Sequence, residues 1–323
     1  MLRLLKFLGV LLLALVIVIA AYIGVNWAPD KSVDELAGRW AQPPSQFVEV
    51  MGMQVHLRDE MAEGADPEAL PVVLLHGTSD SLHTWQGWTD VLSQQRRVIR
   101  FDLPGFGLTG PFPAGDYRMA HYTQFVLAML DELDVPRAIV AGNSFGGQLA
   151  WETAYAAPER VAALVLVDAA GYLFETQSMP IGFRIAQIPG LNELMNRVLP
   201  RGMVESSVRS VYGNPDRVTP ALVDRYYDLT LREGNRAALA ARFREARGTE
   251  DAPARLATLN MPALIIWGDQ DRLIPPDSAT RFHQDLPNNT LRLFPGLGHV
   301  PQEEDPSGTV EAVQTFLAEQ SVP

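Results

Sequence analysis

Residues 142–146 read Gly-Asn-Ser-Phe-Gly, the pattern Gly-x-Ser-x-Gly in which a serine hydroxyl acts as a nucleophile. The apolar run Ala138–Ala141 precedes the pattern and a helical pattern follows it, which is the strand–turn–helix context that this chemistry requires. A sharp turn there exposes the hydroxyl of Ser144, and glycine at both ends of the pattern lets neighbouring backbone pass closely. We therefore expect a nucleophile elbow formed by Gly142, Asn143, Ser144 and Gly146.

The hydroxyl of Ser144 needs a general base, and the chain has six histidines. His299 lies in the glycine-flanked loop 295–301, just after the last expected strand, where a base can lean over the edge of a sheet. We therefore expect His299 to be the base. His76 ends a strand and is expected to be structural. The remaining histidines are interpreted as surface, loop-packing or incidental residues: His56, His83, His121 and His283.

Three aspartates are candidates for the acid that orients the base, and all three lie between Ser144 and His299 in the chain. Asp269 and Asp271 follow the same apolar strand, and Asp168 ends another strand. Their order and positions alone do not separate them. The competing interpretations are a turn-capping role for Asp269 and a structural hydrogen bond for Asp168.

The charge that develops on an attacked carbonyl oxygen needs two hydrogen-bond donors. One should be the backbone N–H of Phe145, which follows the nucleophile and opens a helix whose N-terminus favours negative charge. The other should come from the loop after the strand Pro71–His76, where Thr78 is the best candidate. Each such donor typically contributes ~2.7–4 kcal/mol to stabilising the transition state.

Short apolar runs alternate with helical patterns along most of the chain, which predicts a mostly parallel sheet covered by helices on both faces. The expected strands are Phe47–Val50, Met53–Arg58, Pro71–His76, Arg97–Asp102, Ala138–Ala141, Val161–Val167, Ala263–Trp267 and Thr290–Phe294.

Together these motifs resemble the α/β-hydrolase superfamily over about 46–320, nearly the whole chain after its first segment. The matching pieces are His76-Gly77 with Trp85, Asp102-x-Pro104-Gly105-x-Gly107, the hexapeptide 142–147, Gly-Asp-Gln-Asp at 268–271 with Pro275, and Gly298-His299-x-Pro301-x-x-Glu304-x-Pro306. The resemblance implies an α/β fold with an eight-stranded, mostly parallel sheet. It also favours Asp271 as the acid, because that family places its triad aspartate after the penultimate strand.

The segment between Asp168 and Met261 is too long for one crossover and carries helical patterns divided by prolines. It resembles the helical cap that roofs the site in this family. We expect a cap at 171–255 between two parts of one core, 46–170 and 256–323. The apolar cap residues suggest an acyl or aromatic pocket, although the same residues would serve for packing: Phe174, Met179, Ile181, Phe183 and Leu191.

The chain begins with an uncharged apolar run, Phe7–Val25, which would span about 28 Å as a helix and so nearly match a bilayer core. Arg3 and Lys6 precede it and acidic residues follow it, so the positive-inside rule places the N-terminus in the cytoplasm and the rest outside. We expect a membrane anchor at 1–27 and a polar linker with one helical turn at 28–45. The alternative is a signal peptide whose cleavage releases a secreted protein.

The composition excludes several classes of function. The chain has 26 basic against 38 acidic residues, a net charge of −12, which argues against a nucleic-acid partner. It has no cysteine, which excludes thiolate catalysis and cysteine-based metal sites. We expect no cofactor and no metal, and the oligomeric state stays open.

These observations predict a serine hydrolase that cleaves carboxylic esters, with a small-molecule or lipid ester as substrate. Epoxide hydrolases and haloalkane dehalogenases of the family carry Asp at the position of Ser144, so those activities are not expected. The hexapeptide 142–147 is also similar to that of C–C hydrolases acting on ring-fission diketones, which is the alternative. Those enzymes tend to have a longer oxyanion loop and a Trp soon after the base, whereas here Val300 and Pro301 follow His299. A non-catalytic binding protein on the same fold is the third possibility.

Overall fold

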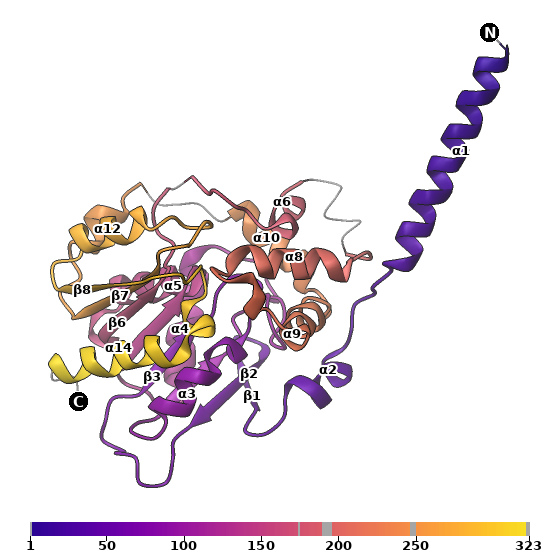
Figure 1. Cartoon of the computed structure of the whole chain (residues 1–323). Coiled ribbons are helices and arrows are strands. Elements are labelled where there is room, and N and C mark those ends of the chain that lie inside the picture. Colours follow the sequence, from indigo (N-terminus) through magenta and orange to yellow (C-terminus); the bar gives the residue numbers. More distant parts are fainter. Residues whose placement is uncertain (1, 174, 189–195, 246–249, 321–323) are drawn as a thin grey trace.

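The computed structural model describes residues 2–173, 175–188, 196–245 and 250–320, and its strands form one eight-stranded sheet (Figure 1). The spatial order is β1-β2-β4-β3-β5-β6-β7-β8. Strand β2 runs antiparallel to both of its neighbours, and every other pair is parallel. The expected mostly parallel sheet is confirmed. The strands are β1 (Gln46–Val50), β2 (Met53–Glu60), β3 (Val72–Leu75), β4 (Val98–Phe101), β5 (Ala138–Asn143), β6 (Val161–Val167), β7 (Ala263–Gly268) and β8 (Asn289–Phe294).

Helices cover both faces of the sheet, with further helices beyond its edge (Figure 1). The helices are α1 (Leu2–Val25), α2 (Val33–Trp40), α3 (Gln86–Leu92), α4 (Met119–Glu132), α5 (Phe145–Ala156), α6 (Ile181–Ala186), α8 (Arg201–Val211), α9 (Pro220–Thr230), α10 (Asn235–Glu245), α11 (Ala252–Leu256), α12 (Asp277–Asp285), α13 (Pro301–Glu304) and α14 (Pro306–Glu319). Short 3-10 helices are Leu82–Trp85, Pro158–Arg160 and Pro215–Arg217.

Alternate residues of one strand enter two separate cores, which shows why the central strands are apolar throughout. In β3, Val73 and Leu75 pack with α4 and α5 on one face, whereas Val72 and Leu74 pack with α3 and α14 on the other. All four side chains are buried. Helices cover both faces of these strands. Because the strands run parallel, their carboxyl ends lie at one edge of the sheet, and the loops at that edge can carry a site.

The described residues between β6 and β7 form helices α6, α8, α9, α10 and α11, with a small hydrophobic core of their own. Leu199, Val208 and Val223 belong to this core, and Val300 from the loop after β8 joins it. These helices therefore pack on the loops at the end of the sheet. We call residues 171–255 the cap below.

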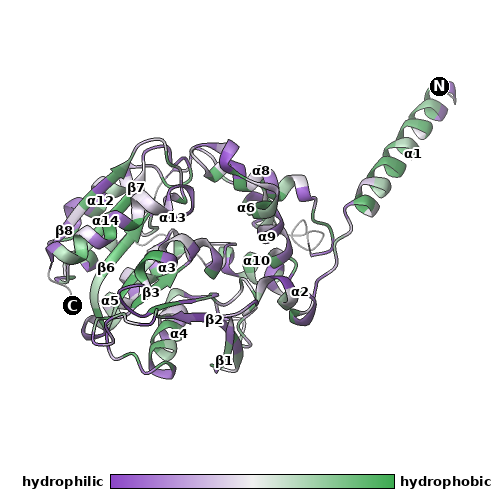
Figure 2. Cartoon of the chain, turned by 60° about the horizontal axis from the view of Figure 1, so that its bottom comes forward, coloured by the Kyte–Doolittle hydropathy of each residue, from purple (hydrophilic) through white to green (hydrophobic). Residues whose placement is uncertain are grey.

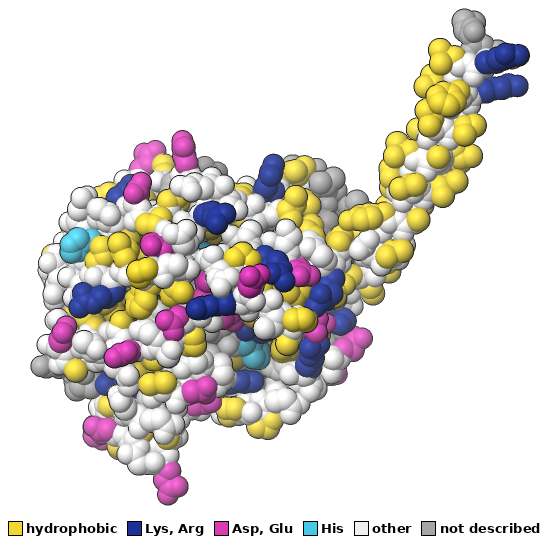
Figure 3. All heavy atoms as spheres, viewed as in Figure 1, with side chains coloured by type: hydrophobic (Ala, Val, Ile, Leu, Met, Phe, Trp, Pro, Cys, Tyr) yellow, Lys and Arg dark blue, Asp and Glu magenta, His cyan; other side chains and the backbone are white. Residues whose placement is uncertain are grey.

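Helix α1 projects away from the rest of the chain as an isolated apolar helix (Figure 1). Among the described residues it is the one helix long and apolar enough to cross a membrane, with a mean hydropathy of 2.9 in an 18-residue window within Arg3–Val25. Hydropathy colouring is green along most of its length (Figure 2), and in the space-filling view basic atoms lie only near its free end (Figure 3). Such a surface fits a lipid environment or a signal segment.

The chain attaches to the cap directly after α1. Trp27 forms an isolated antiparallel bridge with Val198, and the backbone N–H of Ala28 donates to the carbonyl of Arg197 at 2.9 Å. Ala28 is buried in the core of the cap. The segment after the apolar helix is thus fastened to the cap.

Helix α2 is longer than the single turn expected in the linker. Ser32 and Glu35 form a capping box, in which the Ser32 hydroxyl accepts from the Glu35 N–H and the Glu35 carboxylate accepts from the Ser32 N–H. Leu36 is buried against Leu229 of α9. The capping box and this one apolar contact explain why the short polar segment folds as a helix.

Candidate active site

Ser144 lies at the turn between β5 and α5, where the sequence places it. Its backbone is strained, with φ 56° and ψ −117° in a non-glycine residue. A Cβ at Gly142 would lie 2.1 Å from the carbonyl oxygen of Gly146, and one at Gly146 would lie 2.2 Å from that of Leu75. Larger residues at either glycine would therefore displace the turn, and the steric reason for the elbow pattern holds in this chain.

The predicted oxyanion loop passes beside this turn. A Cβ on Gly77 would lie 3.3 Å from the Cβ of Ser144, so the backbone that leads to Thr78 runs directly next to the serine. Thr78, Ser144 and His299 line the same cavity. Phe145 begins α5, and the guanidinium of Arg242 from α10 stacks over its ring at 3.7 Å. Oxyanion binding by Thr78 and Phe145 stays a prediction.

The structure pairs His299 with Asp271. The imidazole Nδ1 lies 2.7 Å from Oδ2 of Asp271, and both side chains are buried. The other carboxylate oxygen of Asp271 accepts the backbone N–H groups of Leu273 and Ile274 at 2.8 and 3.0 Å. An acceptor at Nδ1 fixes the tautomer that leaves Nε2 free to accept a proton, which a general base requires.

Asn143, predicted only as part of the elbow, holds the loop of the base in place. Its side-chain amide donates to the carbonyl oxygens of His299 at 2.9 Å and of Val167 at 3.1 Å. The elbow, the end of β6 and the His299 loop are therefore tied together by one buried side chain. This role depends on contacts between distant segments, which the motif itself does not reveal.

The two other aspartates occupy different places. Asp269 is exposed and its carboxylate accepts the N–H of Gly296 at 2.7 Å, which agrees with a turn-capping interpretation. Asp168 is fully buried and accepts the N–H of Gly268 at 3.1 Å. It also lies near the paired side chains. One carboxylate oxygen of Asp168, one of Asp271 and one ring nitrogen of His299 all lie within 4.8 Å of one another.

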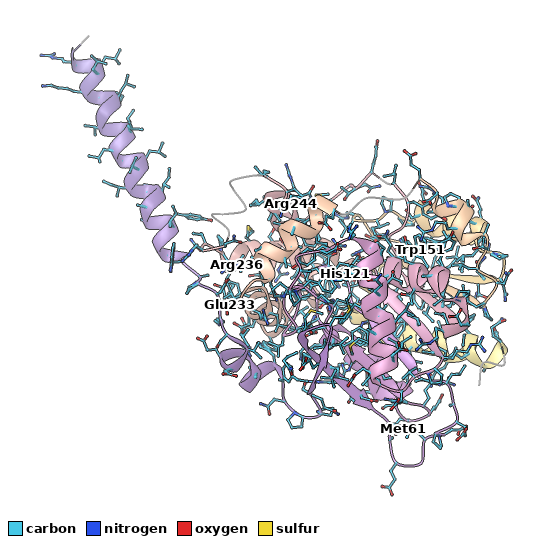
Figure 4. All side chains as sticks on the ribbon, turned by 180° about the vertical axis from the view of Figure 1, so that it is seen from behind. Met61, His121, Trp151, Glu233, Arg236 and Arg244 are labelled. Atoms are coloured by element: carbon cyan, nitrogen blue, oxygen red, sulfur yellow. The ribbon has the colours of Figure 1, made fainter. Side chains whose placement is uncertain are left out.

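An apolar cavity opens over Ser144 and His299, with about 1060 Å³ of free space including its mouth. Among the described residues, the charged lining apart from the histidine consists of Asp80 and Arg236, and Arg236 is paired with Asp30. Figure 4 shows Arg236 on the side of the molecule that faces the base of α1. The apolar lining is Pro180, Phe183, Ala186, Leu199, Met203, Val204, Val208, Val211, Leu239, Leu273 and Val300.

Of the apolar cap residues expected to form a pocket, Phe183 lines the cavity. Met179 and Ile181 are not among its lining residues and are 37% and 44% exposed. Phe174 and Leu191 lie outside the described residues. Helix α8, whose mixed sequence gives no signal of a pocket, contributes four of the apolar lining residues: Met203, Val204, Val208 and Val211.

A buried charge cluster joins the cap to both loops of the site. The guanidinium of Arg225 in α9 pairs with Glu303 at 2.6 Å and with Asp80 at 3.3 Å. The hydroxyls of Tyr212 and Tyr226 donate to Glu303 at 3.0 and 3.2 Å. Burial raises the pKa of both carboxyl groups, and the guanidinium opposes this effect. Asp80 follows Thr78 and Glu303 follows His299, so this cluster connects the cap to both loops of the candidate site.

Two histidines prove to be structural. His76 is buried, donates from Nδ1 to the Gly77 carbonyl at 2.8 Å and accepts the Leu103 N–H at Nε2, and burial lowers its pKa. His56, interpreted from the sequence as incidental, has a definite place: its Nδ1 lies 2.7 Å from Asp102 and its Nε2 lies 2.9 Å from the Ser45 hydroxyl.

This second Ser–His–Asp arrangement differs from the first in its surroundings. The carboxylate of Asp102 also accepts the N–H groups of Leu82 and Leu108, both at 2.8 Å, as a loop-organising residue does. None of Ser45, His56 and Asp102 is among the described residues that line the cavity. We therefore assign these three residues a structural role.

Comparison with known proteins finds relatives by sequence and neighbours by structure. An uncharacterized protein of Mycobacterium tuberculosis is 31% identical over 300 residues, 86% of this chain and 82% of the relative. The 2-hydroxy-6-oxo-2,4-heptadienoate hydrolase of Pseudomonas putida is 30% identical over 261 residues, 77% and 89% of the two chains. A crystal structure of a membrane phospholipase A aligns over 100% of both chains with 23% identity and a TM-score of 0.71.

The model of the α/β hydrolase fold family matches residues 71–306, which span the strands from β3 to β8 and all of Ser144, Asp271 and His299. The match extends over well more than half of the chain and agrees with the sheet order described above. This chain therefore belongs to the α/β-hydrolase family.

Proposed function

We propose that this protein is a serine hydrolase that cleaves carboxylic esters with apolar acyl groups. Ser144 attacks the acyl carbonyl, His299 takes the serine proton and returns it to the leaving alcohol, and Asp271 orients the imidazole. The backbone N–H groups of Thr78 and Phe145 bind the oxyanion, and water then releases the acid from the acyl-enzyme. The observation that carries the proposal is the buried His299–Asp271 pair, whose histidine lines the same apolar cavity as Ser144.

The lining of the cavity supports a neutral, apolar substrate. The name of the relative from Pseudomonas putida denotes a substrate that carries a carboxylate, and C–C bond hydrolysis is therefore the second candidate. In the part of the chain that the structure describes, the charged residues of the lining are Asp80 and Arg236, and Arg236 is already paired with Asp30. Arg225, which lies behind Asp80, is paired with two carboxylates. A carboxylate on the substrate would therefore meet the carboxyl of Asp80, and the described cations in and behind this lining are already paired with carboxylates.

The attachment of the apolar helix to the cap supports a lipid ester as the substrate. The residues that follow α1 pair with 197–199, and Leu199 from this segment lines the cavity. If α1 spans a membrane, the wall of the cavity lies a few residues from the bilayer surface. The full-length structural neighbour, a membrane phospholipase A, agrees with this arrangement.

A hydrolysis panel tests the substrate class. We expect turnover of acyl esters, with longer acyl chains favoured because each buried methylene adds about 0.8 kcal/mol of apolar transfer free energy. A ring-fission diketone should be turned over at least about tenfold less efficiently, measured as kcat/KM. Ser144→Ala supplies the background rate. Efficient cleavage of the diketone with little ester turnover would overturn the ester assignment and establish the C–C alternative.

We propose that α1 is an uncleaved anchor with its N-terminus in the cytoplasm and the catalytic part outside. The proposed domains are an anchor at 1–27, a core made of 46–170 and 256–323, and a cap at 171–255. The full chain should stay with membranes after an alkaline carbonate wash, because an apolar span of this length is held by the bilayer and not by surface charge. N-terminal sequencing provides the control. A soluble mature chain beginning near Ala21 would establish a cleaved signal peptide and a secreted protein instead.

A further inference from the structure

Asp168 is a buried carboxyl group beside the His299–Asp271 pair for which the proposed reaction has no use. It follows β6 with a positive φ of 44°, a backbone region that non-glycine residues rarely adopt. Its side chain has no exposed surface. Strained backbone at a buried ionisable residue, next to reacting groups, points to a role for the side chain itself.

The two oxygens of this carboxyl group have different surroundings. Oδ1 accepts the backbone N–H of Gly268 at 3.1 Å, whereas Oδ2 is buried and has no donor within hydrogen-bond distance among the described residues. The neighbouring carboxyl is that of Asp271, one oxygen of which lies within 4.8 Å of an oxygen of Asp168, and an ionised carboxylate is itself an acceptor. Two buried carboxyl oxygens can be hydrogen-bond partners only if one of them carries a proton.

The hydrogen bonds around Asp271 show where that proton belongs. Asp271 accepts two backbone N–H groups and faces the imidazole of His299, and all three contacts favour its ionised form. Asp168 accepts one backbone N–H. Burial, followed by the charge of Asp271, raises the pKa of Asp168 well above its ordinary value, and the carboxylate of Glu304 acts in the same direction.

We propose that Asp168 is a neutral carboxylic acid whose Oδ2–H donates a hydrogen bond to the Asp271 carboxylate. It is then a positioning residue, because it acts on the base only through Asp271. The hydrogen bond stabilises the charge on Asp271 and lowers its tendency to take the proton of the imidazolium that forms during the reaction. With Asp168 neutral, the two carboxyl groups of Asp168 and Asp271 together carry one negative charge. The kinetic consequences rest on the proposed function, whereas the protonation state does not.

The kinetic test compares Asp168→Asn, whose amide keeps the shape and a donor, with Asp168→Ala, which has neither. We expect Asp168→Ala to lower kcat by about 10- to 100-fold and Asp168→Asn to restore most of that loss. The acid limb of the kcat/KM profile should stay in place in Asp168→Asn, because a neutral group has replaced a neutral group. If Asp168 were ionised, removing its negative charge would destabilise the protonated imidazole and move that limb to lower pH by about one unit, which would overturn the proposal.

Infrared difference spectroscopy of the full chain tests the protonation state without any substrate. Subtracting Asp168→Asn, or Asp168→Ala if only that variant folds, from the wild type at neutral pH should leave the carbonyl band of a protonated carboxylic acid. The exposed residue Asp269 provides the control, because Asp269→Asn should remove only carboxylate bands. Loss of carboxylate bands from the Asp168 variant would overturn the proposal. Because this readout needs no turnover, its failure is distinguishable from failure of the ester assignment.

Discussion

Ser144→Ala is expected to lower kcat/KM for acyl esters by about 10⁴- to 10⁶-fold, because it removes the atom that forms the acyl-enzyme. A residual rate above that in water should persist, since the predicted oxyanion donors and the apolar cavity remain. The substitution is small and the side chain is nearly buried, so thermal unfolding should change little. The rate with purified wild type and variant on the same ester is the measurement.

Ser45→Ala is the matched control, because the Ser45 hydroxyl lies 2.9 Å from Nε2 of His56, a histidine that is likewise paired with an aspartate. It lies outside the cavity lining and should leave ester turnover near the wild-type value. The contrast separates a reacting Ser–His–Asp set from a structural one whose His–Asp distance is the same, 2.7 Å. Loss of activity in Ser45→Ala with retention in Ser144→Ala would mean that the wrong set has been assigned.

Asp271→Asn is expected to lower kcat by about 10⁴-fold, because an amide cannot hold the imidazole in the productive tautomer or stabilise the imidazolium. Asp269→Asn, two residues away on the same loop, should keep at least about a tenth of wild-type activity, since its carboxylate contacts only loop backbone and a neighbouring amide. Steady-state kinetics of both variants, with melting curves to confirm folding, measure the difference. The reverse order of losses would transfer the role of acid to Asp269.

The fold was accessible from the sequence because the central strands are buried on both faces and therefore read as unbroken apolar runs. Val161–Val167 is such a run, and the structure has a strand with the same bounds. The sequence predicts that the strand at Ala138 ends at Ala141, whereas β5 continues through Gly142 and Asn143 into the elbow. The full length of α2 is not predictable in this way, because the helix depends on a capping box, on one buried leucine and on contacts of Arg39 and Trp40 with α9.

The candidate site was predictable where one segment carries the chemistry. The turn at Ser144 needs glycines whose spacing is fixed by local sterics, so the motif specifies it. The motif does not specify the acid in that way, because Asp269 and Asp271 follow the same strand. The fold distinguishes them: Asp271 contacts the imidazole of His299, whereas Asp269 contacts the backbone N–H of Gly296. The resemblance to the family favoured Asp271, and the pairing in the structure agrees with it.

What the sequence could not provide are contacts between segments that only the fold brings together. Asp168 and Asp271 are neighbours because β6 and β7 are adjacent, and His56 reaches Asp102 because β2 lies beside β4. The Arg225 cluster depends on how α9 docks on two loops. No periodicity encodes such packing, and this is why His56 was interpreted as incidental and α8 was not expected to line the cavity.

The central claim is that Ser144 becomes acylated, and mass spectrometry of the protein treated with a fluorophosphonate tests it most directly. The account predicts one adduct per chain, mapped by peptide sequencing to Ser144, prevented by an excess of an ester substrate and absent from Ser144→Ala. Folded wild-type protein that stays unmodified, or an adduct mapped to another residue such as Ser45, would contradict the account.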